Sequence, residues 1–202
     1  MRIGIFGGTF DPVHLGHLII AEQCREQARL DQVLFVPSAR PPHKQTDDIT
    51  PFDKRAEMIR LAIAGNPMFR VEELEKDRPG PSFTVDTLTE LHQRQPADEL
   101  HLIVGSDCLP DLPSWREPAR ILGLAKLIVA VRPGWPVWPQ EQLRAALRLP
   151  AEELVHEQIV TLPLIDIASR DLRRRFSEGR SGRYFVPHAV LAYIADKGLY
   201  RK

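Results

Sequence analysis

Residues 2–17 read RIGIFGGTFDPVHLGH, and this stretch decides the fold. Its first part, residues 2–6, is a short apolar run that predicts a buried strand, and Gly7-Gly8 ends that strand. Residues 15–29 follow with apolar side chains at helical spacing, so we expect an amphipathic helix there. In an open α/β sheet, ligands bind at the carboxyl ends of the strands. The glycine pair therefore lies where a ligand site is expected.

Strands and helices alternate along the rest of the chain. Further strands are expected at residues 33–36, 69–73, 101–104, 127–131 and 159–162. Further helices are expected at residues 51–64, 84–93, 169–178 and 187–197, with Thr50 as the N-cap of the first. Two proline-containing segments, residues 38–50 and 132–139, should be irregular. Because no repeat or low-complexity linker divides the chain, we expect one α/β domain over residues 1–202: a Rossmann-like, doubly wound parallel sheet with helices on both faces.

The composition excludes several classes of protein. The chain has 202 residues, 43% of them hydrophobic, which is enough for a sizeable core and too apolar for wholesale disorder. Its 27 Lys and Arg balance 27 Asp and Glu, so no general attraction to nucleic acid or to a membrane surface is expected. Cys24 and Cys108 are too few for a disulfide framework, which favours the cytoplasm. The longest apolar stretch, residues 121–131, is too short for a membrane span, and Gly7-Gly8 would break a secretory signal.

The segment between the first strand and the first helix has the features of an anion site. Gly7 and Gly8 permit close backbone approach to a ligand, and the helix N-terminus offers free N–H groups. His14 and His17 are three residues apart and share one helix face, while Gly16 leaves space between them. The segment matches neither GxGxxG nor the Walker A motif. A metal-binding pair remains an alternative, although no third ligand lies at a recognisable spacing, and so does a surface pair without a role.

The complete string of residues 7–17, GGTFDPVHLGH, resembles the T/HxGH signature of the nucleotidyltransferase superfamily, and in particular the bacterial nicotinate mononucleotide adenylyltransferases. Later segments resemble that family's motifs in the same order: PPHK at 41–44, SFTVDT at 82–87, GSD at 105–107, LPSW at 112–115 and RPG at 132–134. One segment departs from the pattern. The family's ISSTxIR is IASRDLR here at residues 167–173, so that Ala168 and Arg170 replace a serine and a threonine.

The resemblance implies an enzyme of NAD biosynthesis that transfers the adenylyl group of ATP to nicotinate mononucleotide and releases pyrophosphate. The attacking phosphate monoester, with a second pKa near ~6, is already largely dianionic at neutral pH, so no general base is required. The barrier is repulsion between phosphates, which cations and N–H dipoles must offset. Mg²⁺ is expected with ATP, held mainly by phosphates and water, and no metal-binding residue is expected.

The same resemblance assigns roles to residues of this chain. The expected catalytic residues are His14, His17, Lys44 and Arg173. ATP is expected to contact Gly7, Gly8, Thr9, Phe10, His14, His17, Gly105, Asp107, Ser169 and Arg173. The mononucleotide is expected to contact His43, Lys44, Thr84, Trp115 and Arg132. Purely structural alternatives are open for three of them: Lys44 as a solvated loop charge, Trp115 as a core or lid residue, and Asp107 as a turn residue.

The sequence is also compatible with other functions. A related adenylyltransferase could use nicotinamide mononucleotide or phosphopantetheine as acceptor, and a nucleotide-binding sensor of the same fold would have lost turnover. The arginines at residues 170–183 are expected to form a solvated helix face and not a nucleic-acid site. The two cysteines are expected to be small buried hydrophobic residues. Neither nucleic acid nor membrane is expected as a partner, and a homo-oligomer is left open.

Overall fold

The computed structural model describes residues 1–41, 49–132, 134–150, 155 and 158–201. Six strands form one sheet in the order β3-β2-β1-β4-β5-β6, and every neighbouring pair is parallel. The strands are β1 (Arg2–Gly8), β2 (Gln32–Pro37), β3 (Phe69–Val71), β4 (Glu99–Gly105), β5 (Lys126–Ala130) and β6 (Gln158–Val160). The order reverses between β1 and β4, which lie side by side in the middle of the sheet. Such a reversal opens a crevice at the carboxyl ends of the two strands.

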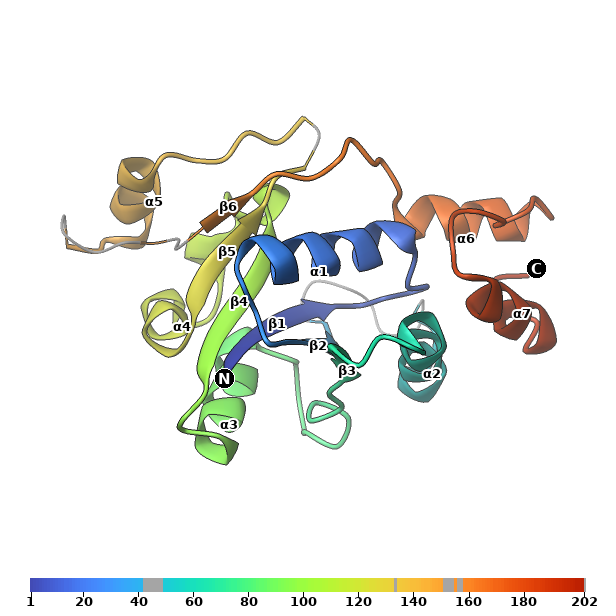
Figure 1. The fold of residues 1–202 in the computed structure, drawn as a ribbon, viewed down its shortest axis with the longest axis horizontal. Helices are drawn as coiled ribbons and strands as arrows, with labels where there is room; N and C mark the ends of the chain where they lie inside the picture. The colour runs from blue at the N-terminus through green and yellow to red at the C-terminus, as the bar shows by residue number, and fades with distance from the viewer. Residues whose placement is uncertain (42–48, 133, 151–154, 156–157, 202) are drawn as a thin grey trace.

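Helices cover both faces of this sheet (Figure 1). One buried apolar cluster joins the sheet to α1 (Leu15–Gln27), α2 (Phe52–Ile63), α6 (Ser169–Ser177) and α7 (His188–Asp196). A second cluster joins the opposite face to α3 (Thr84–Arg94), α4 (Pro118–Leu124) and α5 (Gln140–Leu147). Alternate residues of β1 supply the two cores, with Ile3 and Ile5 in the second cluster and Phe6 in the first. The predicted doubly wound fold is confirmed.

All the predicted strands and helices are present, with ends that differ by at most a few residues. Two helices, α4 and α5, were not predicted. Helix α4 is short and continues into β5 through one apolar stretch, so its helical spacing is hidden. Helix α5 buries Leu143 and Leu147 and follows Pro139, a helix-start signal that the preceding prolines obscure. None of the helices that the structure describes is long and apolar enough to cross a bilayer.

The prediction that Thr50 caps α2 is wrong. Pro51 holds the N-cap position, and no side chain caps the helix. The backbone of Thr50 is engaged in tertiary contacts: its N–H donates to Asp11 Oδ2 at 3.2 Å, and its carbonyl accepts from Arg55 Nε at 2.7 Å. Contacts with the loop after β1 therefore prevail over the local capping preference.

Candidate active site

Two neighbouring cavities lie at the carboxyl ends of β1 and β4. The first has a volume of about 470 Å³, and the second, about 250 Å³, lies between α1 and the start of α6. His17, Ile20 and Arg132 line both cavities, so the two spaces meet at these residues. In Figure 1, α1 begins beyond the end of β1, and α6 begins beside the start of α1.

The structure brings most of the predicted site residues to these cavities. The first cavity is lined by Gly7, Gly8, Thr9, Phe10, His17, Thr84, Gly105, Asp107, Trp115 and Arg132. The second is lined by His14, His17, Arg132 and Ser169. Arg173 lines neither of these two cavities. His43 and Lys44 lie outside the described residues.

His14 and His17 form a reciprocal pair at the start of α1. His14 is the N-cap residue, and its Nδ1 accepts from the backbone N–H of His17 at 3.4 Å, while His17 Nδ1 accepts from the N–H of His14 at 3.2 Å. The two rings stack with their centroids 3.6 Å apart. A neutral imidazole that accepts at Nδ1 has its proton on Nε2. Each ring therefore offers one N–H donor on the side away from the backbone.

Both histidines are neutral at physiological pH. Burial, with a smaller contribution from the positive charge of Arg132, lowers the pKa of His14 to about 3. Burial also lowers the pKa of His17 well below its usual value, with smaller contributions from His14 and Arg132. The pair therefore presents N–H dipoles beside the helix N-terminus and carries no imidazolium charge.

The loop after β1 is held by aromatic packing beneath it. Phe10 is buried, has a backbone φ of 50°, and packs its ring edge against Phe6 and His17. A Cβ at Gly8 would lie 3.0 Å from the Phe10 ring, so glycine permits this close approach. The contact with Phe10 also holds the imidazole of His17 in position.

At the end of β4, Asp107 and Arg132 form an ion pair of 2.9 Å. We expected these residues to contact different substrates, and here they contact each other. Buried Ser106 fixes the arginine, because its Oγ accepts from Arg132 N at 2.9 Å and donates to the Trp135 carbonyl at 2.7 Å. A Cβ at Gly105 would come within 2.2 Å of Asp107 Oδ1. Glycine at position 105 therefore leaves the space that the Asp107 carboxylate occupies.

The start of α6 is tied to the loop after β1. Ser169 Oγ donates to the Pro12 carbonyl at 2.9 Å, and Arg173 Nη1 donates to the Asp11 carbonyl at 2.7 Å. The N-cap residue, Ala168, provides no side-chain cap. Arg170 lines the second cavity and forms no hydrogen bond or ion pair within the described part of the chain. The segment that departs from the family pattern therefore places an exposed arginine at the second cavity, where the family has a threonine.

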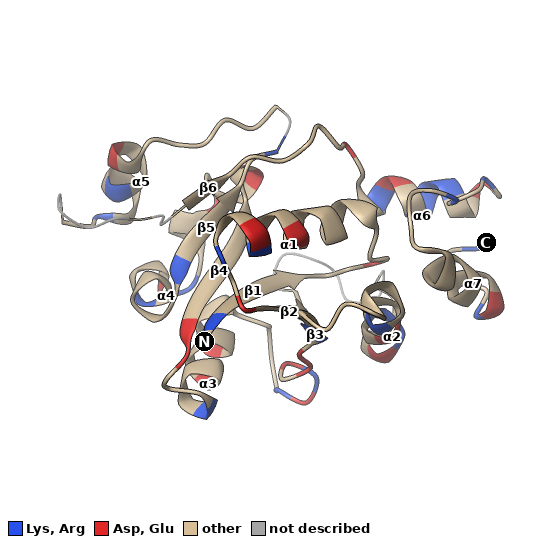
Figure 2. Ribbon diagram, in the orientation of Figure 1, with Lys and Arg blue, Asp and Glu red and all other residues tan. Residues whose placement is uncertain are grey.

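Most arginines of this region are exposed to solvent. Arg170, Arg174, Arg180 and Arg183 are exposed, and two of them pair with neighbouring acids, Arg174 with Asp171 and Arg180 with Glu178. Figure 2 shows both basic and acidic segments on α6, as on the rest of the molecule. The expected solvated helix face is confirmed for Arg170 and Arg174, whereas Arg180 and Arg183 are exposed in the segment after α6.

Several residues that line the first cavity were not predicted from the sequence. They are Ser38, Glu75, Ser82, Thr87, Cys108 and Arg116. Ser82 and Thr87 belong to the SFTVDT segment, and Arg116 follows the predicted Trp115. Their position in or beside a family motif could have identified these three residues. Cys108 is half-buried and lines the cavity, and burial raises the pKa of its thiol to about 11. The expectation of a buried hydrophobic cysteine holds for Cys24 alone.

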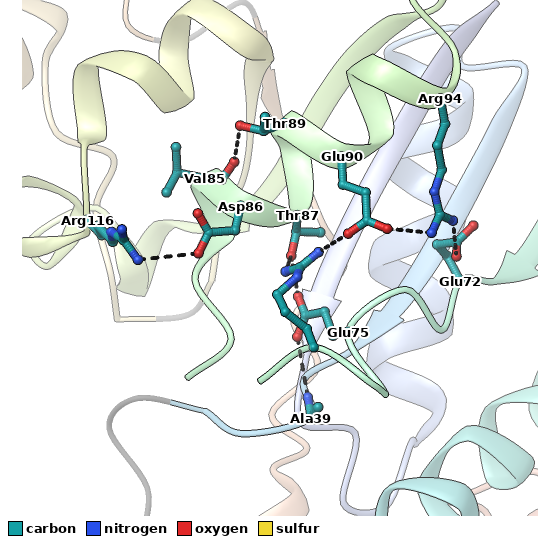
Figure 3. A network of polar contacts seen from close by, with 11 residues as sticks. Ala39, Glu72, Glu75, Val85, Asp86, Thr87, Thr89, Glu90, Arg94 and Arg116 are labelled. Carbon is teal, nitrogen blue, oxygen red and sulfur yellow. Dashed lines mark hydrogen bonds and ion pairs between the residues drawn. The ribbon is translucent and has the colours of Figure 1, made fainter. Parts of the chain in front are cut away.

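Glu75 had no local signal in the sequence. Its carboxylate is buried and accepts from Thr87 Oγ1 at 2.5 Å and from Ala39 N at 3.3 Å. Figure 3 shows the contacts that extend from this pair. Arg78 Nη1 donates to Thr87 Oγ1 at 2.9 Å, and Arg78 Nη2 pairs with Glu90 at 2.5 Å. The network fastens α3 to the segment after β2 and forms one wall of the first cavity.

Comparison with known proteins gives consistent results. The cytidylyltransferase-like family model matches residues 5–175. Relatives from Thermomicrobium roseum and Thermus thermophilus, both named probable nicotinate-nucleotide adenylyltransferase, are each 48% identical to this chain. The first match covers 99% of this chain and 92% of the relative, and the second covers all of both.

Solved structures agree on the fold. The Plasmodium falciparum nicotinic acid mononucleotide adenylyltransferase complexed with NaAD superposes with a TM-score of 0.80 at 19% identity, covering 98% of this chain and 97% of that one. The same enzyme complexed with APC gives 0.79 at 18% identity, with 98% and 96% covered. The resemblance seen in the motifs is thus confirmed over the full length, and the chain belongs to the nicotinate-nucleotide adenylyltransferase family of cytidylyltransferase-like proteins.

Proposed function

We propose that this protein transfers the adenylyl group of ATP to nicotinate mononucleotide, giving nicotinate adenine dinucleotide and pyrophosphate in NAD biosynthesis. The observation that carries the proposal is the His14–His17 pair, whose neutral rings each keep an N–H donor on the side away from the backbone. His14 lines the second cavity, and His17 lies where the two cavities meet. Near relatives named for this activity support it.

Each cavity suits one part of the reactants. In the first, the Trp115 indole offers a stacking face for the pyridine ring, and Thr84 begins α3, whose N-terminus favours the nicotinate carboxylate. The second cavity takes phosphates of ATP, since its ionisable lining among the described residues is His14, His17, Arg132 and Arg170. Asp107 is the proposed acceptor for ribose hydroxyls of ATP, in which case Arg132 is released toward a phosphate.

The chemical step is an in-line displacement at the α-phosphorus. A phosphate oxygen of the mononucleotide forms the new P–O bond, and the bond from the α-phosphorus to the oxygen bridging to the β-phosphate breaks, so that pyrophosphate leaves with both electrons. No proton has to be removed from the dianionic nucleophile. His17, which lines both cavities, donates to the oxygens on which charge develops, and His14 donates from the second cavity.

This proposal includes Lys44, His43 and Arg173, with roles taken from the resemblance to the family. Lys44 and His43 would bind the mononucleotide phosphate. Arg173 donates to the carbonyl of Asp11, so we assign it the support of the phosphate loop in addition to any direct charge effect. Ser169 holds the same loop through Pro12 while lining the second cavity.

Mg²⁺ is the proposed cofactor, bound with ATP. The two carboxylates lining the first cavity are occupied, Asp107 by Arg132 and Glu75 by Thr87. No cluster of three metal-ligating side chains occurs among the described residues. This donor set fits an ion that is held chiefly by phosphates and water. When bound, the ion offsets negative charge on the phosphates.

The setting of the reaction follows from the same features. We propose that residues 1–202 act as one catalytic domain in the cytoplasm, where the free thiols of Cys24 and Cys108 stay reduced. ATP and the mononucleotide are its partners, and neither nucleic acid nor a membrane is required. A homo-oligomer is compatible with this arrangement and is not needed to complete the cavities.

Product identification tests the proposal. The protein is incubated with ATP, Mg²⁺ and one acceptor at a time: nicotinate mononucleotide, nicotinamide mononucleotide or phosphopantetheine. We expect mass spectrometry to find nicotinate adenine dinucleotide as the fastest-forming product. A faster-forming product from either of the other acceptors would show that it is the preferred substrate. The absence of any adenylylated product would favour a nucleotide sensor.

A further inference from the structure

A single buried guanidinium connects the loops that form the first cavity. Arg55 of α2 is 1% exposed and lines neither cavity. Each of its three nitrogens donates to a different backbone carbonyl: Nη1 to Thr9 at 2.7 Å, Nη2 to Ser38 at 2.8 Å and Nε to Thr50 at 2.7 Å. A charged donor so completely buried is uncommon, and here its N–H groups are used to hold backbone.

The three carbonyls belong to segments that are far apart in the sequence. Thr9 follows β1, Ser38 follows β2, and Thr50 precedes α2. Thr9 and Ser38 both line the first cavity, so the planar guanidinium sets the spacing between two parts of its wall. One further hydrogen bond, from Ser38 N to the Gly8 carbonyl at 2.8 Å, joins the same two loops.

The charge of Arg55 has a buried counterpart in Asp11. Asp11 is 2% exposed, and its carboxylate accepts from Thr50 N at 3.2 Å and from the Tyr200 hydroxyl at 2.6 Å. Its carbonyl accepts from Arg173 of α6. Arg55 and Asp11 therefore link the loop that leads to His14 with α2, α6 and the C-terminal segment.

We propose that Arg55 is a positioning residue for adenylyl transfer: it fixes the loop after β1, which leads to the phosphate-binding histidines, against the loop after β2 on the acceptor side. This inference rests on the proposed function. Arginine is needed because its rigid fork reaches three acceptors at once, whereas the single ammonium of lysine cannot reproduce that geometry. A shift of ~1 Å between reacting groups can lower the rate about 100-fold.

The experiment compares Arg55→Lys and Arg55→Ala with a control on the same helix, Arg60→Ala. Arg60 is exposed and pairs with Glu57 and Glu73. Single-turnover pyrophosphate release is measured with enzyme saturating over limiting ATP, and with excess nicotinate mononucleotide and Mg²⁺. Under these conditions the rate constant does not depend on the fraction of folded molecules. A residue that merely stabilises the fold would leave it unchanged.

We expect the single-turnover rate constant to fall about 100-fold in Arg55→Ala, to fall clearly in Arg55→Lys, and to remain at the wild-type value in Arg60→Ala. Added guanidinium ion should restore part of the rate to Arg55→Ala and none to His17→Ala. If Arg55→Ala does not fold, Arg55→Lys gives the answer. A wild-type rate constant in the folded Arg55 variants overturns the inference while leaving the proposed function intact. No release by the wild-type protein overturns both.

Discussion

The imidazoles of His14 and His17 stack face to face, 3.6 Å between centroids, with each Nδ1 accepting the other residue's backbone N–H. This arrangement fixes the tautomer of both rings, because only Nε2 is left to carry the proton. It also explains why two buried imidazoles can stand so close together: neither is charged at neutral pH. The pair therefore presents one N–H donor to the second cavity, from His14, and one to the junction of the cavities, from His17, without imidazolium repulsion.

The first prediction concerns the pH dependence of turnover. Burial lowers the pKa of His14 to about 3 and that of His17 in the same direction, so both rings are neutral throughout the physiological range and remain neutral as the pH rises. We expect kcat to rise through about pH 6, as the acceptor phosphate becomes dianionic, and then to stay level to about pH 9. A steady-state profile with saturating substrates measures this. A decline of kcat as the pH rises through about 6.5 would show that an imidazolium is the active form.

The second prediction concerns His17→Ala. Because His17 lines both cavities, it should act on charge that develops during transfer, and its loss should lower kcat about 100-fold while changing the KM values much less. Initial rates with each substrate varied in turn provide both constants. His92→Ala, an exposed histidine on α3, is the matched control. An effect confined to KM would contradict the assigned role.

The third prediction tests whether Asp107 belongs to the ATP site, and it uses a variant that should remain folded. In Gly105→Ala, the new Cβ would come within 2.2 Å of Asp107 Oδ1 and 3.0 Å of Arg132 Cδ, so both side chains must move. These are flexible side-chain atoms, so we expect a folded protein with a raised KM for ATP. Gly123→Ala meets nothing within 4 Å and should leave that KM unchanged. An unchanged KM for ATP in a folded Gly105→Ala protein would remove Asp107 from the ATP site.

The fourth prediction concerns the C-terminal anchor. Tyr200 donates to buried Asp11 at 2.6 Å, and burial raises the pKa of the tyrosine, so the hydroxyl stays protonated as a donor. Tyr200→Phe leaves one carboxylate oxygen without this partner and should lower the free energy of unfolding by about 1–3 kcal/mol. The loss is measured by urea unfolding, as a lower midpoint with an unchanged dependence of the unfolding free energy on urea concentration. Tyr184→Phe is the control, since Tyr184 is 85% exposed. Equal midpoints for the two variants would contradict the anchor.

The sequence predicted what depends on local pattern. The strand ending at Gly7-Gly8, the alternation that specifies a doubly wound sheet and the pairing of His14 with His17 all follow from periodicity and spacing over a few residues. The resemblance to family motifs also assigned Gly105 and Asp107 to ATP, and Thr84 and Trp115 to the mononucleotide. All four residues line the first cavity.

Features that depend on tertiary contact were not predictable in this way. Glu75 and Arg55 lie in segments with no chemical signature, and only folding brings them to Thr87, Thr9 and Ser38. Thr50 has a good local capping sequence but is engaged by Asp11 and Arg55 instead. The Asp107–Arg132 ion pair joins two motifs that the sequence assigned to separate substrates.

The most direct test of the account is the rate of pyrophosphate release from ATP and Mg²⁺, with and without nicotinate mononucleotide, by protein shown to be folded and to bind ATP. The account predicts rapid release that requires the acceptor, with one nicotinate adenine dinucleotide formed for each pyrophosphate. No release with this acceptor, or release that proceeds equally without it, would contradict the claim that this site joins ATP to a mononucleotide.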